Sequence, residues 1–292
     1  METLRAIRNR IKSVSSTKKI TKAMKMVSAS KLRRTQNAMT AVKPYADKSK
    51  EILTSVISDS DSSKNPFLIP REVKRKSFVL FVGNRGLCGS YNSNILRFLT
   101  DLISQESLPY DLIIVGSWGK DLLKSLNLPI LKTFDSISDA PSSESAREVS
   151  EYVKRLYLSG KTDEIILVYQ HFRNVIVQSP FRLQLLPVSP DTENLEVKEP
   201  ANREFIFEPD RDTILSNILQ LYIDVTVYSV LLEAKTGEHA ARMSAMTAAI
   251  DNTEELLAEL TLRMNRVRQA NITTEINEIV GGASALSLKN GL

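Results

Sequence analysis

The sequence predicts an α/β domain inserted between two long terminal helices that pair with each other. Two features predict the terminal helices. At the N-terminus no proline precedes Pro44 and no glycine precedes Gly83; at the C-terminus no proline follows Pro209. Because proline and glycine disfavour helix interiors, segments that lack them can stay helical over many turns. The third feature is an alternation of strand-like and helix-like segments over residues 75–205. This alternation indicates βαβ units and a largely parallel sheet.

The N-terminal helix is predicted from apolar residues spaced alternately three and four apart. This spacing marks a coiled-coil seam, the line of residues that faces a partner helix. The seam begins with Leu4, Ile7, Ile11 and Val14. The apolar line then moves to Ile20, Met24 and Val27, and it returns to the first register at Leu32, Met39 and Val42. Such a shift predicts a stutter with locally altered winding, and Pro44 is a candidate kink.

The C-terminal helix has the stronger pattern. Alternate steps of three and four from Leu215 to Val267 give sixteen seam positions, of which twelve are apolar. The exceptions are Ser229, Thr236, His239 and Thr253. Gly281-Gly282 is the predicted end of the helix. Gly237 costs about 1 kcal/mol relative to alanine in a helix interior. Three readings are open: a bend, a close contact, or a glycine that the helix merely tolerates. The seam histidine is expected to be a buried polar residue and not a catalyst.

Charge also favours pairing of the two helices. Residues 1–43 contain twelve Lys or Arg and only one acidic residue, whereas residues 210–292 contain seven basic and eleven acidic residues. Neither helix can bury its apolar seam alone, so we expect them to pack together as a helical hairpin around the middle domain. A transit peptide is disfavoured because no cleavage signal follows an apolar core, and we expect the mature chain to begin near Met1 in a cytosolic compartment.

The middle domain is predicted in order along the chain. Buried strands are expected at 77–83, 111–116 and 163–172, helices at 91–104, 117–126 and 143–160, edge strands at 175–188 and 204–209, and linkers at 58–70 and 189–204. The single cysteine, Cys88, excludes an intramolecular disulfide, and two histidines make a zinc site unexpected. The uncharged runs are all shorter than the ~18 residues of a membrane span, so no transmembrane segment is predicted.

The glycine loop GNRGLCGSYN, from Gly83 to Asn92, follows a strand and precedes a helix, as phosphate-binding loops do. Its spacing nevertheless fits neither nucleotide motif. A P-loop requires four residues between its glycines followed by Lys, and the dinucleotide motif requires G-x-G-x-x-G. Arg85 is therefore interpreted as a surface residue and Cys88 as a small buried one. Asp163, Glu164 and His171 form no catalytic triad, so the domain is expected to bind protein and to need no cofactor or metal.

Four segments resemble one known family. They are IKSVSSTKKITKAMKMVSASKLRRTQ (11–36), NRGLCGSYN (84–92), EHAARMSAMTAAIDNTEELL (238–257) and NRVRQANITTEINEIVGGASAL (265–286). Together they are similar to the gamma subunit of F-type ATP synthase over the whole chain. The resemblance implies an antiparallel coiled coil of the terminal helices around a Rossmann-like domain. The patterns above divide the chain into a helix (1–58), a linker (59–74), an α/β domain (75–208), a helix (209–286) and a tail (287–292).

The resemblance further implies a non-catalytic rotor in the central stalk of a proton-translocating complex. Its partners would be three alpha and three beta subunits, the epsilon subunit and the c-ring, at the cytoplasmic face of a bacterial inner membrane. The implied contacts with the alpha/beta ring are Lys18, Lys22, Met24, Lys25, Arg34, Arg242, Arg268, Gln269, Thr273 and Glu275. Asn84 stands where the family usually has Asp, Gly237 where it has Ser, and Met264 where it has Tyr. The thiol-regulated insertion of the chloroplast type is absent from the sequence.

Two alternatives are open at this point. The basic N-terminal helix is compatible with nucleic-acid binding, although it lacks interleaved aromatic residues and a known binding motif. The α/β domain is compatible with a cofactor-dependent enzyme, which the glycine spacing disfavours. A steep salt dependence of DNA affinity would favour the first alternative, and calorimetric binding of NAD or ATP would favour the second.

Overall fold

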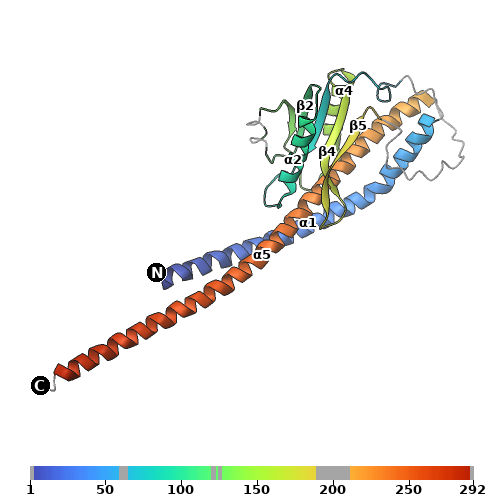
Figure 1. The fold of residues 1–292 in the computed structure, drawn as a ribbon. Helices are drawn as coiled ribbons and strands as arrows, with labels where there is room; N and C mark the ends of the chain where they lie inside the picture. The colour runs from blue at the N-terminus through green and yellow to red at the C-terminus, as the bar shows by residue number, and fades with distance from the viewer. Residues whose placement is uncertain (1–2, 59–64, 120–122, 124–126, 189–210, 290–292) are drawn as a thin grey trace. The chain divides into compact units, whose positions relative to one another are not determined.

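The computed structural model describes residues 3–58, 65–119, 123, 127–188 and 211–289. The chain divides into two compact units. The body unit is Ser28–Ser244, and the terminal unit combines Met1–Val27 with Ala245–Leu292. Two long helices, α1 (Leu4–Ser58) and α5 (Arg211–Lys289), contribute to both units and are coloured blue and orange to red in Figure 1.

The body unit is built on a five-stranded mixed sheet in the order β3-β2-β1-β4-β5. The strands are β1 (Lys76–Phe81), β2 (Tyr110–Val115), β3 (Ile130–Phe134), β4 (Glu164–Phe172) and β5 (Gln178–Leu186). The pairs β1–β2, β1–β4 and β2–β3 are parallel, and β5 pairs antiparallel with β4 at the edge. The three buried strands and the first edge strand predicted from sequence are confirmed as β1, β2, β4 and β5. The short strand β3 is an addition.

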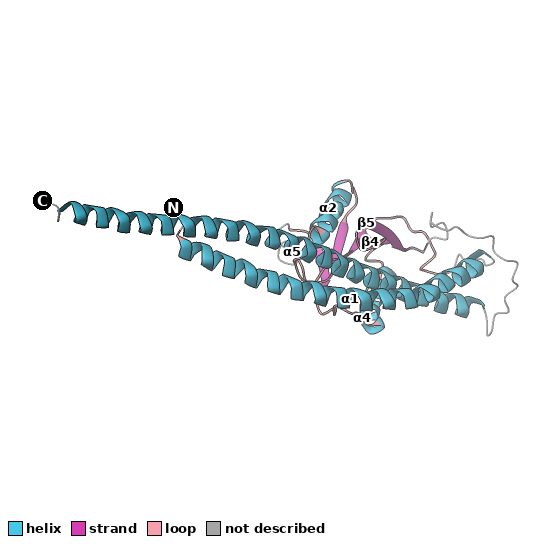
Figure 2. Ribbon diagram, turned by 90° about the horizontal axis from the view of Figure 1, so that it is seen from below, coloured by secondary structure: helices cyan, strands magenta, loops and turns pink. Residues whose placement is uncertain are grey.

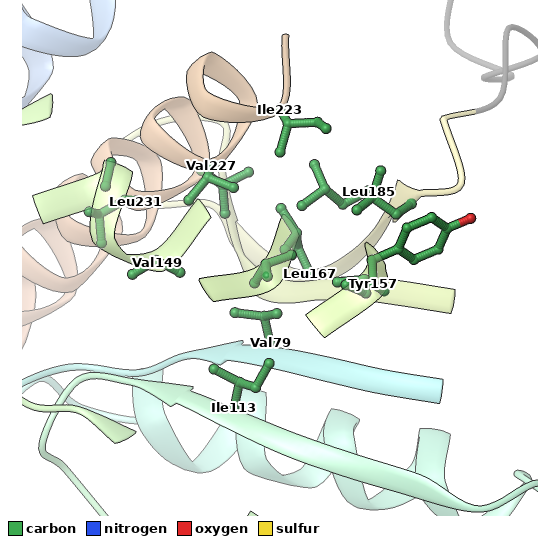
Figure 3. Close-up of a cluster of buried hydrophobic side chains, with 14 of the residues drawn as sticks. Val79, Ile113, Val149, Tyr157, Leu167, Leu185, Ile223, Val227 and Leu231 are labelled. Atoms are coloured by element: carbon green, nitrogen blue, oxygen red, sulfur yellow. The ribbon is translucent and has the colours of Figure 1, made fainter. Parts of the chain in front are cut away.

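Alternating side chains of the strands enter two separate cores, because successive residues of a strand point to opposite faces. One core contains Phe78, Leu80 and Leu112 and is covered by α2 (Tyr91–Ser104). The other contains Val79, Ile113 and Leu167 and is covered by α4 (Ser143–Leu158) and the first turns of α5. Figure 3 shows Ile223, Val227 and Leu231 of α5 above Val79 and Leu167. The first turns of α5 therefore form part of the core of the body.

Helix α4 begins where the chain supplies a cap. Ser142 has extended backbone angles, and its hydroxyl accepts a hydrogen bond from the Ser145 N–H at 3.3 Å. Glu144 lies in the first turn and Arg155 in the last, where each complements the helix dipole. Local sequence signals thus favour the start and the end of this helix. The helix covers the sheet on the same side as α5.

The terminal helices pair antiparallel within each unit. In the body unit, the segments of α1 and α5 lie side by side (Figure 2), and Leu32 and Met39 of α1 share a cluster with Ala240 and Met243 of α5. Further along α1, Leu53 joins the core that contains Leu215 and Leu219 of α5. In the terminal unit, Lys18 forms an ion pair with Glu254 at 2.8 Å. Later residues of α1 thus contact earlier residues of α5. This is the antiparallel pairing that the sequence predicts.

The stutter predicted in α1 is wrong. The inward-facing residues keep the original register, each of them buried or half-buried, and they include the polar residues Lys18, Thr21, Lys25, Ser28 and Thr35. Of the three residues assigned to the shifted seam, Ile20 and Val27 are 61% and 53% exposed, and Met24 is half-buried. The polar residues fit the seam because hydroxyls bond to carbonyls of their own helix, as Thr21 does to Thr17 and Lys18. Lysine stems bury while their amines reach out.

Helix α5 extends beyond its partner. All sixteen predicted seam positions from Leu215 to Val267 are buried or half-buried, whereas residues 268–283 are exposed. The helix also continues through Gly281-Gly282 to Lys289, so the predicted stop there is wrong. A glycine weakens a helix by about 1 kcal/mol but does not force an end, and the next residues, ASALSLK, contain helix formers and no proline. Pro44 likewise lies inside α1, which continues to Ser58.

Some predicted elements cannot be compared. The second edge strand (204–209) and the linker 189–204 lie outside the described residues, as does residue range 59–64 of the first linker. Most of the predicted helix 117–126 is also outside them, although Leu123 is described and buried in the core beneath α2.

Candidate functional site

The glycine loop connects β1 to α2, and hydrogen bonds hold its first residue on both sides. The Gly83 N–H donates to the Asn92 side chain at 2.9 Å, and the Gly83 carbonyl accepts from the Trp118 N–H at 2.9 Å. Gly89 has a φ of 58°, a left-handed conformation that glycine adopts without strain. The start of the loop is therefore fixed by one hydrogen bond within the loop and one from Trp118.

Helix α5 crosses this loop and bonds to it at several points. The Tyr91 hydroxyl donates to the Ala234 carbonyl at 2.7 Å. The Arg242 guanidinium donates to the carbonyls of Arg85, at 3.1 Å, and Gly86, at 3.3 Å. From β4, the Phe172 N–H donates to the Glu233 carboxylate at 2.8 Å. Loop, sheet and helix are thus joined by direct hydrogen bonds.

Three charged side chains of α5 are buried at this crossing. Glu238 is 1% exposed, and its carboxylate accepts from Lys235 at 2.9 Å and from Arg242 at 2.7 Å. Burial would raise the pKa of Glu238, but the two cations outweigh that effect and hold the pKa below its usual value. A buried charge is tolerated when it is paired and hydrogen-bonded. The three residues form the network that we call the Glu238 cluster.

His239 extends the cluster to α1. Its Nε2 lies 2.9 Å from the Asp139 carbonyl and its Nδ1 lies 3.4 Å from Arg242. The neutral tautomer with the proton on Nε2 satisfies both contacts. Asp139 also accepts from Lys31 of α1, which holds the carboxylate pKa below its usual value against the effect of burial. Asn84 donates to the Ile137 carbonyl at 2.6 Å in the same place, so the loop, α1 and α5 meet there.

The pH dependence of folding should report on this histidine. Burial lowers the pKa of His239, against the opposing effects of the Asp139 carbonyl and Glu238. Below the unfolded pKa of about 6.5 the unfolded chain therefore binds more protons, so stability present at neutral pH is lost as the pH falls through the lowered folded pKa. We expect the free energy of unfolding, measured in urea, to fall on acidification from pH 7. The fall should be shallower in His239→Gln; identical slopes would contradict a neutral buried imidazole.

Gly237 marks a close contact. A Cβ at this position would lie 3.3 Å from Cε2 of the Tyr91 ring and 3.6 Å from Oε1 of Gln178. The helix thus approaches the loop and β5 closely enough that a side chain here would have to displace its neighbours. The close contact, one of three readings predicted for this glycine, is confirmed.

The other residues considered for chemistry, Cys88, Arg85 and His171, form no catalytic arrangement among the described residues. Cys88 is 2% exposed, and burial raises the pKa of its thiol, which disfavours the reactive thiolate. Arg85 is exposed, as interpreted from sequence. His171 pairs with Glu233 of α5 and belongs to the helix–sheet contact. No group of three or more His, Cys, Asp or Glu within the described chain is placed to hold a metal ion.

The residues assigned to ring contact by resemblance fall into three groups. Lys22, Arg34, Arg268, Gln269, Thr273 and Glu275 are exposed; Lys18, Met24 and Lys25 are half-buried on the α1 seam or beside it; Arg242 is buried in the Glu238 cluster. Sequence reasoning missed Lys235 and Glu238 altogether. Their spacing with His239 and Arg242 places four polar residues on one helix face in an apolar seam, and this pattern was the available signal.

One described helix, α5, is long and apolar enough to cross a membrane by length and composition alone, with a most apolar window of mean hydropathy 1.4. The same helix supplies Leu215, Leu219 and Ile223 to the core of the body. Core helices pass the same test, so the signal is weak.

The fold and the site define a class of protein: two long helices that pair antiparallel, with a mixed α/β domain inserted between them and bonded to one of them through buried charges. A family model described as ATP synthase matches residues 3–286. The chain belongs to this family.

Curated relatives match over nearly the whole chain. An ATP synthase gamma chain of Desulfitobacterium hafniense is 42% identical over 286 residues, which is 98% of this chain and 100% of the relative. An ATP synthase gamma chain of Staphylococcus saprophyticus is 39% identical over 292 residues, again 98% and 100%.

Solved structures share the fold. The rotor of the Euglena gracilis mitochondrial ATP synthase superposes with a TM-score of 0.68 at 20% identity, covering 92% of this chain and 98% of that one. A chain of the Tetrahymena thermophila mitochondrial ATP synthase central stalk and c-ring superposes with a TM-score of 0.58 at 26% identity, covering 79% and 99%.

Proposed function

We propose that the chain is the central-stalk rotor subunit of an F-type ATP synthase and couples rotation of a c-ring to the catalytic cycle of an alpha/beta ring. The observation that carries this proposal is the end-to-end match with ATP synthase gamma chains at about 40% identity. The antiparallel pairing of the terminal helices supports it, because a double-stranded seam resists bending and twisting better than one helix.

The subunit itself is proposed to be non-catalytic. Its glycine loop is bonded to α5, and the Glu238 cluster fills the position beside Gly83 where substrate chemistry would need space. The proposed location is the cytoplasmic face of a bacterial inner membrane, with the epsilon subunit and c-ring as partners of the body. Exposed basic residues of α1, among them Lys22 and Arg34, offer positive charge to an acidic partner surface.

Purification of the complex from native membranes through a tag on this chain tests the proposal. We expect one copy of the chain for every three alpha and three beta subunits. Recovery of the chain without either ring subunit would contradict it.

The exposed end of α5 provides a test of ring contact. Gln269 and Thr273 are exposed, and the Thr273 hydroxyl bonds only to the Gln269 carbonyl of the same helix in the described structure, at 2.9 Å. Replacing both residues with alanine should therefore leave the helicity of the isolated chain unchanged while weakening assembly or turnover of the complex. Circular dichroism and ATPase assays measure the two effects. Loss of helicity would instead assign these residues to the fold.

A further inference from the structure

Doubly wound α/β folds receive their ligands in one place. The crevice lies beyond the carboxyl ends of the parallel strands, at the point where the strand order reverses. In this sheet β1 is central, with β2 on one side and β4 on the other, and both neighbours run parallel to it. The glycine loop follows the carboxyl end of β1. A phosphate would be expected at this position if the domain bound a nucleotide.

The occupant of this crevice is a carboxylate of the same chain. A Cβ built on Gly83 would lie 3.0 Å from Cδ and 3.1 Å from Oε1 of Glu238. Real Cβ atoms show such distances only when a neighbour gives way, so the absence of a side chain at Gly83 is what lets α5 bring its carboxylate against the loop. Gly83, conspicuous in the sequence as part of a phosphate-like loop, thus accommodates an acidic side chain from α5.

The polarity of the loop is the reverse of that of a phosphate site. Phosphate loops aim backbone N–H groups at an anion. Here the Gly83 N–H is engaged by Asn92, whereas the carbonyls of Arg85 and Gly86 point at the cation Arg242. The negative charge of Glu238 is balanced by Lys235 and Arg242 of its own helix. The helix therefore brings both the acid and its counter-ions, and the loop supplies acceptors.

We infer that this crevice is a socket for Glu238 and that the socket is a torque-bearing joint between α5 and the α/β body. Its contacts are buried and mutually satisfied, so they resist displacement more than exposed ion pairs do. Tyr91, bonded to Ala234, and Glu233, bonded to Phe172, hold the helix one turn before the socket. Load applied to the distal part of α5 reaches the body through these residues. The load-bearing role rests on the proposed rotor function; the socket itself does not.

Two glycines of the same loop provide a matched test of the socket in the isolated full chain. Gly83→Ala should lower the melting temperature by about 4–8 °C, because the new Cβ overpacks the buried Glu238 carboxylate and also lies 3.2 Å from Oδ1 of Asn92. Gly86→Ala adds the same methyl group where nothing lies within 4 Å, and its carbonyl can still accept from Arg242; no fall is expected. Gly83→Ala should cost less in a Glu238→Asp background than in the wild type, because the shorter side chain withdraws from the clash. Equal effects of the two alanines would overturn the socket.

The mechanical role requires the assembled complex. With the alpha/beta ring immobilised, a bead is attached to a cysteine introduced at exposed Glu148 of α4, and its angular variance is measured during pauses. Glu238→Gln should increase this variance over the wild type, because an amide cannot pair with both cations. A purely structural role would reduce the number of assembled molecules and leave the variance of the survivors unchanged, which would overturn the joint. Absence of any rotation in the wild type would instead contradict the rotor function and leave the isolated-chain result standing.

Discussion

Replacing Arg242 with methionine should destabilise the isolated chain by about 3 kcal/mol or more, the cost of removing one partner from a buried ion pair. For a protein of this size the melting temperature should fall by roughly 6–12 °C. The variant keeps the volume of the arginine stem but leaves Glu238 with only Lys235, and it removes the donor to the carbonyls of Arg85 and Gly86. Differential scanning calorimetry of the purified chain measures the effect.

This prediction separates two roles for Arg242. As a ring contact, the role implied by resemblance, its loss would affect only the assembled complex. As a member of the Glu238 cluster, its loss affects the chain alone as well. Arg268→Met is the matched control, because Arg268 is exposed on the same helix and its replacement should change the melting temperature little. An unchanged melting temperature in Arg242→Met, together with lost ATPase coupling, would support the ring contact and contradict the internal role.

Leu219→Ala should cost about 2–5 kcal/mol of folding free energy, the range for a buried leucine whose cavity does not collapse. Leu219 is 0% exposed in the core between α5 and the sheet. Leu221, two residues further along the same helix, is 38% exposed, and its replacement should cost far less. Urea unfolding of both variants measures the difference. Similar values would mean that the first turns of α5 are not part of the body core, which would reopen the membrane-spanning interpretation of this helix.

Much of the fold follows from periodicity. The seam from Leu215 to Val267 has a single repeat over many turns, and every one of its positions is shielded in the structure. The strands β1, β2 and β4 are continuous apolar runs, typical of parallel strands buried on both faces. Strand β3, with the sequence ILKTF and a half-exposed pattern, lies at the sheet edge and lacks such a run. Its pairing with β2 is a tertiary effect that no local pattern reveals.

The errors have a common physical cause. The stutter and the stop at Gly281-Gly282 were both inferred from residue type alone. Lys18 and Thr21 occupy the seam because a lysine stem can bury and a hydroxyl can bond to its own helix. A prediction that admits only apolar residues to a seam therefore misses polar residues that can also face the partner helix.

The site could be predicted only in part. The loop from Gly83 to Asn92 stands out in the sequence, but nothing local shows that Glu238 would lie against it. That contact joins residues more than 150 positions apart. The resemblance implies that Arg242 contacts the alpha/beta ring. In the structure its side chain instead donates hydrogen bonds to the loop of the same chain.

Single-molecule rotation tests the central claim most directly. A probe attached through Glu148→Cys labels one site of this chain, because its native Cys88 is buried. With the alpha/beta ring fixed to a surface and ATP added, we expect the probe to turn in one direction and to pause with threefold symmetry. Steady ATP hydrolysis accompanied only by random wobble of the probe would show that this chain is not the rotor.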